Sequence, residues 1–165
     1  MVIIVMGVSG SGKTTIGEKL AATLGWGFYD GDDFHPPANV NKMSRGIPLS
    51  DADRHAWLLQ LRSLITQLHA TEDNAVIASS ALKDSYRQIL TQNDEEAMVV
   101  FLRGNYELIM KRMESRQDHF MKADMLQSQF DTLEAPTDAI AVDIALAPDE
   151  IVDFIISRLP SSANG

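Results

Sequence analysis

Short apolar runs alternate along this chain with stretches in which apolar residues recur at helical spacing. The runs are brief and several are rich in β-branched residues, which is typical of strands buried on both faces of a sheet. Five strands are predicted in this way, at residues 2–6, 27–30, 75–79, 98–102 and 140–145. Between them, Ile16, Leu20 and Leu24 recur every four residues, and a second helical face runs from Trp57 to Leu68. The alternation predicts an α/β fold, a parallel sheet with helices on both faces.

One segment interrupts this alternation after the second predicted strand. Residues 31–50 are rich in Pro, Asn and Gly around a predicted short helix at 36–44. Ser50 with Asp53 then predicts the start of the next helix. We expect a substrate-binding subdomain at about residues 31–60. Because such sheets bind ligands beyond the carboxyl ends of their strands, this is a natural place for a substrate.

A second interruption is a basic segment at about residues 112–124, which we expect to be a lid. It follows a helix opened by Asn105, and Arg112 and Arg116 share a helical face directly before His119. A lid arginine that closes over a reacting anionic group would stabilise the charge that develops on its oxygens and exclude water. The alternative is a solvated basic helix end, which the helix dipole favours.

The composition narrows the class of partner. The 165 residues suit a single domain, residues 1–165, and 14 basic against 23 acidic residues give a formal charge of −9. The electrostatic field of a molecule with this negative charge repels polyphosphate backbones and anionic membranes, so neither nucleic acid nor membrane is expected as a partner. The absence of cysteine excludes disulfides, thiolate catalysis and cysteine zinc sites. Residues 2–6 are too short an apolar run for a signal peptide, and a cytoplasmic protein is expected.

A glycine-rich motif of the form G-x-x-x-x-G-K-[ST] joins the first predicted strand to the first predicted helix. Its glycines let the backbone curl so that successive N–H groups face one concavity, and the helix N-terminus adds partial positive charge. The motif therefore predicts a site for the phosphates of a nucleoside triphosphate. Lys13 would reach the β- and γ-phosphates, and the Thr14 hydroxyl would ligate Mg²⁺. The residues expected at this nucleotide site are Gly7, Val8, Ser9, Gly10, Ser11, Gly12, Lys13, Thr14 and Thr15.

Hydrolases, switches and kinases share this loop, so neighbouring motifs must separate them. The guanine-selecting N-K-x-D of GTPases is absent, because no aspartate stands two places after Asn41-Lys42. The third predicted strand ends in Ser79-Ser80, without the aspartate that conventionally supports the metal there. Asp30, at the end of the second strand, is the first candidate for that carboxylate.

An acidic turn after the second strand predicts the acceptor side of the site. Residues 30–36 place several carboxylates just past the strand end, and Gly31 allows the chain to bend over the nucleotide. Phosphoryl transfer needs a group that orients the attacking hydroxyl and takes its proton, and we assign this role to Asp32. The alternative is a solvated acidic turn that binds nothing, since Asp and Gly favour turns.

Basic groups that work against the overall negative charge are candidates for holding an anionic acceptor. They are His35, Lys42, Arg45, Arg54, Lys83 and Arg87. Lys83 and Arg87 are four apart and are expected on one helical face, where they could hold the carboxylate and hydroxyls of an acidic polyol. The alternative is that these side chains are exposed and paired with Asp51, Asp53 or Asp84.

The sequence resembles the gluconokinases, small P-loop kinases related to the shikimate and nucleoside monophosphate kinases. The resemblance rests on the phosphate loop, on D-G-D-x-x-H-P at residues 30–36 and on S-A-L-K-x-x-Y-R at residues 80–87. Many kinases share the loop, whereas the other two motifs together look specific to gluconokinases. Further landmarks are Asn39, Lys42-Met43, Gly46, Pro48-Leu49, Asp53-Arg54, Trp57, Arg112, Arg116, His119-Phe120, Gln129-Phe130 and residues 133–136.

This resemblance implies ATP-dependent phosphorylation of D-gluconate at its terminal hydroxyl by a homodimer. It implies a five-stranded parallel P-loop kinase sheet of order 2-3-1-4-5. It also implies that Asp32 is the acceptor-binding base, that Asp30 belongs to the Mg²⁺ shell, and that two arginines, Arg112 and Arg116, serve the lid. Adenine is expected between Arg112 and the loop around Pro136. The residues implied to hold gluconate are Asp32, His35, Arg54, Lys83, Arg87 and His119.

Two other functions stay open on the sequence alone. A related small-molecule kinase would act on shikimate or another sugar acid in place of gluconate. A nucleotide-dependent regulatory or binding module would bind ATP and transfer nothing. Such a module would need neither basic groups facing Asp32 nor a lid over the phosphates, so those two features favour a kinase.

Overall fold

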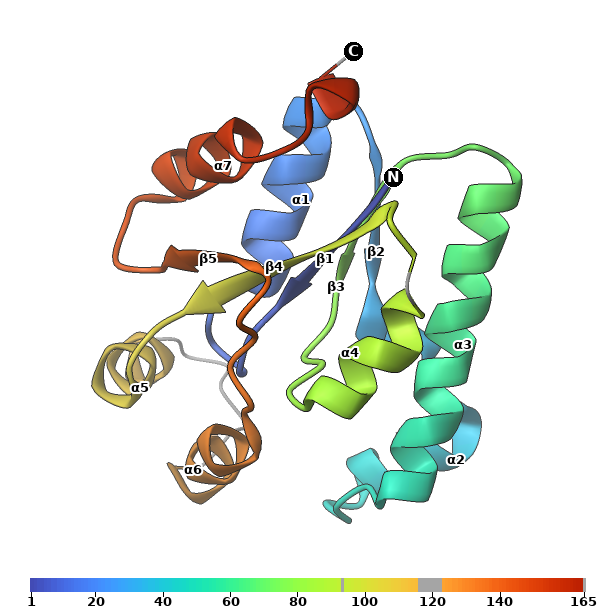
Figure 1. Cartoon of the computed structure of the whole chain (residues 1–165). Helices are drawn as coiled ribbons and strands as arrows, with labels where there is room; N and C mark the ends of the chain where they lie inside the picture. Colours follow the sequence, from blue (N-terminus) through green and yellow to red (C-terminus); the bar gives the residue numbers. More distant parts are fainter. Residues whose placement is uncertain (93, 116–122, 165) are drawn as a thin grey trace.

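The sheet has the architecture that the sequence predicts. The computed structural model describes residues 1–92, 94–115 and 123–164. Five parallel strands form one sheet in the order β2-β3-β1-β4-β5 (Figure 1). The strands are β1 (Val2–Met6), β2 (Gly27–Asp30), β3 (Ala75–Ala78), β4 (Ala97–Arg103) and β5 (Ile140–Asp143). The α/β class and the strand order implied by the resemblance are therefore confirmed.

Helices cover both faces of this sheet. They are α1 (Lys13–Leu24), α2 (Pro37–Ser44), α3 (Asp51–Ala70), α4 (Asp84–Thr91), α5 (Tyr106–Glu114), α6 (Ala123–Thr132) and α7 (Pro148–Ser157), with the 3₁₀ turns η1 (Gly31–Phe34) and η2 (Ser161–Asn164). In Figure 1, α1 and α7 cover one face, and α3 and α4 cover the other. Helices α5 and α6 lie side by side beyond the end of β4. None of the described helices is long and apolar enough to span a bilayer.

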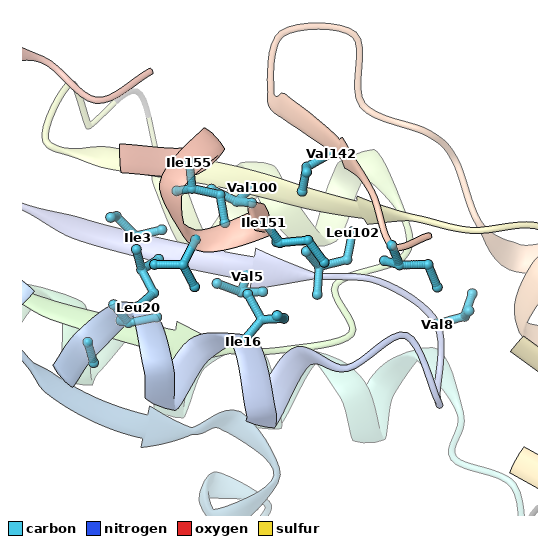
Figure 2. Close-up of a cluster of buried hydrophobic side chains, with 14 of the residues drawn as sticks. Ile3, Val5, Val8, Ile16, Leu20, Val100, Leu102, Val142, Ile151 and Ile155 are labelled. Carbon is cyan, nitrogen blue, oxygen red and sulfur yellow. The ribbon is translucent and has the colours of Figure 1, made fainter. Parts of the chain in front are cut away.

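Strand β1 is buried on both faces, which explains its unbroken apolar sequence. Ile3 and Val5 pack in one cluster with side chains of α1 and α7 (Figure 2). Ile4 and Met6 pack in a second cluster with side chains of α3 and α4. Complete burial of one such side chain is worth about 1.5–3 kcal/mol. The central strand thus anchors both helical layers and fixes the position of the loop that follows it.

Both predicted helix starts are present. The Ser50 hydroxyl accepts a hydrogen bond from the Asp53 N–H at 3.1 Å, and the Asp53 carboxylate accepts one from the Ser50 N–H at 2.9 Å. This reciprocal cap opens α3. Asn105 opens α5 in a similar way, because its Oδ1 accepts a hydrogen bond from the Leu108 N–H at 2.8 Å. The short helix predicted at residues 36–44 is also formed, as α2.

The last strand is shorter than predicted. Strand β5 ends at Asp143, although the apolar pattern continues to residue 145. The Asp143 carboxylate accepts a hydrogen bond from the Ala145 N–H at 2.8 Å. Such a local turn competes with the extended conformation. Ile144 is buried in the same cluster as α1 and α7 without belonging to the strand, so apolar character alone misplaced this boundary.

Candidate active site

The phosphate loop leaves the end of β1 and enters α1 at Gly12. Gly10 and Gly12 have φ angles of 80° and 95°, in the left-handed region that favours glycine. A Cβ on Gly10 would also lie 2.9 Å from Cγ of Met113, because α5 packs against the loop. The turn therefore favours glycine at both positions, and the neighbouring helix also requires it at Gly10. The start of α1 adds N–H groups that have no partner within the helix, an arrangement suited to phosphate.

Lys13 folds back over the loop. Its Nζ donates hydrogen bonds to the carbonyl oxygens of Gly7 and Val8, at 3.0 and 3.1 Å. Burial lowers the pKa of Lys13 to about 8, although the negative charges of Asp32 and Asp30 oppose this shift. A poorly solvated ammonium group interacts more strongly with an anion than an exposed one does. Lys13 is therefore well placed for a phosphate group.

The phosphate loop and the acidic turn border one cavity of about 180 Å³. Its walls come from the loop, from the start of α1 and from the ends of β2 and β3. They are Ser9, Gly10, Gly12, Lys13, Thr14, Thr15, Asp30, Asp32, Ala78 and Ser79. The structure thus brings together residues that the sequence assigned separately to nucleotide, metal and acceptor.

A tight turn after β2 sets the position of Asp32. Its backbone N–H donates a hydrogen bond to the Asp30 carboxylate at 3.0 Å, which starts η1. A Cβ on Gly31 would lie 2.6 Å from the carbonyl oxygen of Ala78, so glycine is required where the turn passes β3. The side chain of Asp32 is 79% exposed, which leaves it accessible to a substrate. Desolvation by the neighbouring protein, followed by repulsion from Asp30, raises the pKa of Asp32, while Lys13 opposes the shift.

His35 follows η1 and packs against α3. Its ring stacks on Trp57, with the ring centroids 4.7 Å apart, and its side chain is only 6% exposed. The Nε2 atom lies 3.9 Å from Oδ1 of Asp32. Burial lowers the pKa of His35 and favours the neutral imidazole, although Asp32 opposes this shift. The structure therefore places His35 directly beside the predicted base.

Arg54 and Lys83 lie close together where α3 and α4 begin. Their terminal nitrogens approach the Asp51 carboxylate to 3.8 and 3.6 Å. The Tyr86 hydroxyl donates a hydrogen bond to the same carboxylate at 2.9 Å. The acidic pairing that the sequence left open is therefore present for both basic residues. Lys83 borders a separate cavity of about 270 Å³ together with Asp51 and Tyr86, not the cavity of the phosphate loop.

Arg87 does not lie where the sequence placed it. Its guanidinium group is buried and donates hydrogen bonds to the carbonyl oxygens of Ala81, Leu82 and Glu134, at 2.9, 3.1 and 2.6 Å. The expected shared helical face with Lys83 is absent, because Lys83 is the extended N-cap of α4 and not a helical residue. In this structure Arg87 joins two chain segments and is not among the residues that line the phosphate-loop cavity.

Arg112 and Pro136 have different surroundings in this structure, although the expected adenine site puts them on either side of one ligand. The Arg112 guanidinium donates a hydrogen bond to the carbonyl oxygen of Ile144, just beyond β5, at 2.6 Å. Pro136 instead lines a groove beside Arg87 and Asp84 on the α4 side of the sheet. The segment that contacts Arg112 is therefore the one after β5, and not the loop around Pro136.

Part of the expected lid is not among the described residues. Helix α5 ends at Glu114, so Arg112 is described within the last turn of that helix. Arg116 and His119 lie outside the described ranges. The predictions made for these two residues, closure over the phosphates and contact with the acceptor, therefore stay predictions.

The structure adds Ser79 to the site. Its hydroxyl is buried at the end of β3, borders the phosphate-loop cavity, and has no hydrogen-bond partner in the described part of the chain. A buried hydroxyl without a partner is costly unless a ligand or water satisfies it. In the sequence, Ser79 is marked only by its position after a buried strand, where conventional sites carry an aspartate that supports the metal.

Gln129 is a second residue whose role the sequence did not specify. Its Oε1 accepts a hydrogen bond from the Ser9 N–H at 2.7 Å, and its Nε2 donates one to the Ser9 hydroxyl at 2.9 Å. This paired contact joins α6 to the phosphate loop. It fixes the approach of α6, the helix that follows the expected lid, to the loop that would bind phosphates.

The oxygen atoms around the cavity suit Mg²⁺. The Thr14 hydroxyl, the Asp30 carboxylate and the unpaired Ser79 hydroxyl all border it. These are hard donors, which Mg²⁺ prefers. No group of three or more His, Cys, Asp or Glu side chains forms a metal site within the described residues. That is consistent with Mg²⁺ sites that use one or two protein oxygens together with substrate phosphates and water.

Comparison with known proteins identifies the family. The sequence model of the shikimate kinase family matches residues 9–159. The thermosensitive gluconokinase of Escherichia coli K12 is 47% identical over 145 residues, covering 86% of this chain and 78% of that protein. A probable gluconokinase of Xenopus tropicalis is 42% identical over 96% of this chain and 91% of its own length. The crystal structure of a gluconokinase from Sinorhizobium meliloti 1021 is 42% identical and superposes with a TM-score of 0.83, covering 94% of this chain and 89% of that one. This chain therefore belongs to the gluconokinase family of P-loop kinases.

Proposed function

We propose that this kinase transfers the γ-phosphoryl group of ATP to the terminal hydroxyl of D-gluconate, giving 6-phosphogluconate and ADP. The observation that carries the proposal is the single cavity in which the phosphate loop meets Asp30 and Asp32. Membership of the gluconokinase family supports gluconate as the acceptor. Shikimate and other sugar acids are the acceptors of the competing hypothesis.

The nucleotide side of the reaction is assigned to the phosphate loop. The amides of residues 7–15 and the start of α1 would hold the triphosphate, and Lys13 would exchange its contacts with the Gly7 and Val8 carbonyls for phosphate oxygens. Arg112 anchors the end of α5 to Ile144, beyond β5. We infer that adenine lies beside Arg112 near that segment.

The acceptor side is assigned to Asp32. Its carboxylate would accept a hydrogen bond from the terminal hydroxyl of gluconate and point the oxygen at the γ-phosphorus. As the new P–O bond forms, the bond between the γ-phosphorus and the β–γ bridging oxygen breaks, and the hydroxyl proton passes to Asp32. The raised pKa of Asp32 suits a group that must take up a proton during transfer.

Thr14 and Asp30 are the residues that would hold Mg²⁺. When bound, Mg²⁺ neutralises charge on the β- and γ-phosphates during transfer. The Ser79 hydroxyl borders the same cavity and would give or accept a hydrogen bond there. Asp30 also holds the Asp32 N–H, so one carboxylate would connect the metal side of the site to the acceptor side.

The acceptor assignment can be tested with a coupled assay of ADP release. Gluconate should stimulate turnover strongly, whereas shikimate, glycerate and nucleoside monophosphates should not. If only a different acceptor stimulates ADP release, that acceptor is the substrate and the assignment of gluconate is wrong. ATP binding without stimulation by any acceptor would instead favour a nucleotide-binding module. Calorimetric binding of gluconate in the presence of a non-hydrolysable ATP analogue would measure the acceptor site directly.

A homodimer in the cytoplasm remains part of this proposal. The dimer rests on the resemblance to bacterial kinases of this family, and the location rests on the cysteine-free composition. Light scattering on the purified chain would measure its oligomeric state. A mass equal to the 18.2 kDa monomer at all concentrations would contradict the dimer.

The affinity for ATP should fall as the pH rises above about 8. In the free protein, Lys13 has a pKa lowered to about 8, so it loses its positive charge above that pH. A bound phosphate stabilises the charged form and raises that pKa, so binding should take up a proton near pH 8. Titration calorimetry in two buffers of different ionisation enthalpy measures this uptake. Equal affinity between about pH 7 and pH 9.5, together with no proton uptake, would contradict the role of Lys13.

Replacement of Arg87 by Ala should lower stability and leave the affinity for gluconate almost unchanged. The change would leave the carbonyl oxygens of Ala81 and Glu134 without the Arg87 donor, whereas that of Leu82 would keep its hydrogen bond from the Glu134 N–H. We expect a loss of about 3 kcal/mol and a fall in Tm of roughly 10 °C. Gln88→Ala, on an exposed face of α4, is a matched control that should change neither property. A KM for gluconate raised tenfold or more at unchanged Tm would restore Arg87 to the acceptor site.

A further inference from the structure

Asn39 lies buried between the acidic turn and α3, and the proposed chemistry gives it no role. Its side chain is 2% exposed. Its amide nitrogen, Nδ2, lies 2.9 Å from the carbonyl oxygen of Asp53 and 3.2 Å from Nδ1 of His35. An amide nitrogen has two hydrogens, so it can donate to both of these atoms. Asn39 thus connects the start of α3 to the histidine beside the predicted base.

The contact with Asp53 fixes which way the Asn39 amide points. A backbone carbonyl can only accept a hydrogen bond, so the amide nitrogen, and not the oxygen, must face it. The same nitrogen then faces Nδ1 of His35, which must therefore accept. A neutral imidazole that accepts at Nδ1 has its proton on Nε2. The hydrogen-bond geometry thus selects one of the two tautomers of His35.

The ring of His35 is held so that this proton faces the reaction side. Stacking on Trp57, at 14° between the ring planes, fixes the plane of the imidazole. Trp57 is itself held by a hydrogen bond of 2.8 Å from its Nε1 to the carbonyl oxygen of Gly31, the residue before Asp32. Nε2 of His35 lies 3.9 Å from Oδ1 of Asp32. That distance is too long for a direct hydrogen bond between His35 and Asp32. The Nε2–H group is therefore free to donate a hydrogen bond to a hydroxyl oxygen that lies beside Asp32.

We propose that Asn39 is a positioning residue that holds His35 as the Nε2–H tautomer, so that His35 presents a hydrogen-bond donor beside Asp32 to the acceptor hydroxyl. The hydrogen bond from His35 to the acceptor hydroxyl rests on the proposed function, whereas the tautomer of His35 follows from the contacts of Asn39 alone. The hydroxyl donates its proton to Asp32 and accepts a hydrogen bond from His35 through a lone pair. The opposite tautomer would direct a lone pair of Nε2 at the carboxylate and the hydroxyl oxygen, which is repulsive. Asn39 therefore acts on the reaction through His35.

Nitrogen NMR on the full chain, labelled with ¹⁵N-histidine, measures the tautomer without any substrate. The signals of His35 are assigned among the four histidines by their loss in His35→Gln. In the native chain, Nδ1 should give the shift of an unprotonated ring nitrogen and Nε2 that of a protonated one. Asn39→Asp places a carboxylate against Nδ1 and should move the proton to Nδ1. A protonated Nδ1 in the native chain, or a tautomer unchanged by Asn39→Asp, would overturn the proposal.

A double-mutant cycle then tests whether Asn39 acts through His35. Asn39→Ala should lower kcat/KM for gluconate roughly tenfold in the native background and less than about twofold in a His35→Ala background, as expected for coupled residues. Equal losses in both backgrounds would show a purely structural role and overturn the proposal. Asp53→Asn is the matched control, because it weakens the cap of α3 but keeps the backbone carbonyl that Asn39 contacts and does not touch His35. It should lower Tm and leave the tautomer unchanged.

The proposed function and the role of Asn39 can fail separately. If gluconate stimulates no turnover, the proposed function fails, while the NMR experiment still decides whether Asn39 sets the tautomer. If turnover is normal but Nδ1 carries the proton, the proposed function stands and the role of Asn39 is overturned. A protonated Nδ1 in the native spectrum overturns the role of Asn39 whether or not the Asn39 variants fold, so the proposal can be refuted without them.

Discussion

Replacing Asp32 by Asn should lower turnover with gluconate by roughly 10²-fold or more, because general-base catalysis contributes about 10² to 10⁴. The amide has nearly the same shape as the carboxylate, but it cannot accept the hydroxyl proton at neutral pH. ATP binding should persist, since the phosphate loop is unchanged. Steady-state kinetics with gluconate, together with calorimetry of a non-hydrolysable ATP analogue, measures both effects.

Asp33→Asn is the control for this prediction. Asp33 is the next residue in the same turn and is exposed, but it does not border the phosphate-loop cavity. Both variants remove one negative charge, so a general electrostatic effect would alter them equally. Only Asp32→Asn should lose turnover. A rate near that of the native chain would remove Asp32 from the role of base and leave the transfer to positioning and electrostatic stabilisation alone.

The sheet and its loop could be predicted because burial leaves a direct mark on the sequence. Ile3 and Ile4 pack in clusters on opposite faces of β1, so neither position can be polar, and the run is continuously apolar. Helix starts leave a similar mark, because a side chain such as Ser50 or Asn105 must satisfy a free backbone N–H. Gly10 is marked for a third reason, since both its backbone angle and the contact with α5 require glycine.

The position of Arg87 could not be predicted, because nothing local reveals which carbonyl oxygens its guanidinium group will meet. Its partners are Ala81 and Leu82, just before α4, and Glu134, which is 47 positions further along the chain. Helical spacing suggested a face shared with Lys83, but that argument holds only inside a helix, and Lys83 precedes α4. Prediction of this site would have required the tertiary contact between two distant segments.

Ser79 was missed for a related reason. A serine after a buried strand is common and carries no signal of its own. Its meaning comes from the cavity that it shares with the phosphate loop and with the turn after β2. The absence of an aspartate at this place was visible in the sequence. The packing of β3 between β1 and β2 instead puts a buried hydroxyl there, one that has no hydrogen-bond partner among the described residues.

Replacing Lys13 by Ala should weaken transition-state stabilisation by about 3 kcal/mol, or roughly 10²-fold in kcat/KM, the typical loss for one preorganised electrostatic contact. The ammonium group is already poorly solvated and is held at the cavity by two backbone carbonyls. It therefore gives up little bound water when its contacts pass from these carbonyls to phosphate oxygens, and it can then stabilise the charge that moves with the phosphoryl group. Kinetics under saturating gluconate, compared with calorimetric affinity for ADP, separates loss of transfer from loss of binding.

Lys19→Ala is the matched control, because Lys19 lies on the same helix, is exposed and pairs with Asp149 far from the cavity. Loss of positive charge from α1 is common to both variants, so a long-range effect of charge would appear in both. If Lys13 acts only as a general attraction for ATP, its loss should raise KM for ATP and leave kcat unchanged. A fall in kcat confined to Lys13→Ala would show that the ammonium group acts more strongly on the transition state than on bound ATP. Transfer at the native rate would instead contradict the assignment of the loop, because no other lysine or arginine borders that cavity among the described residues.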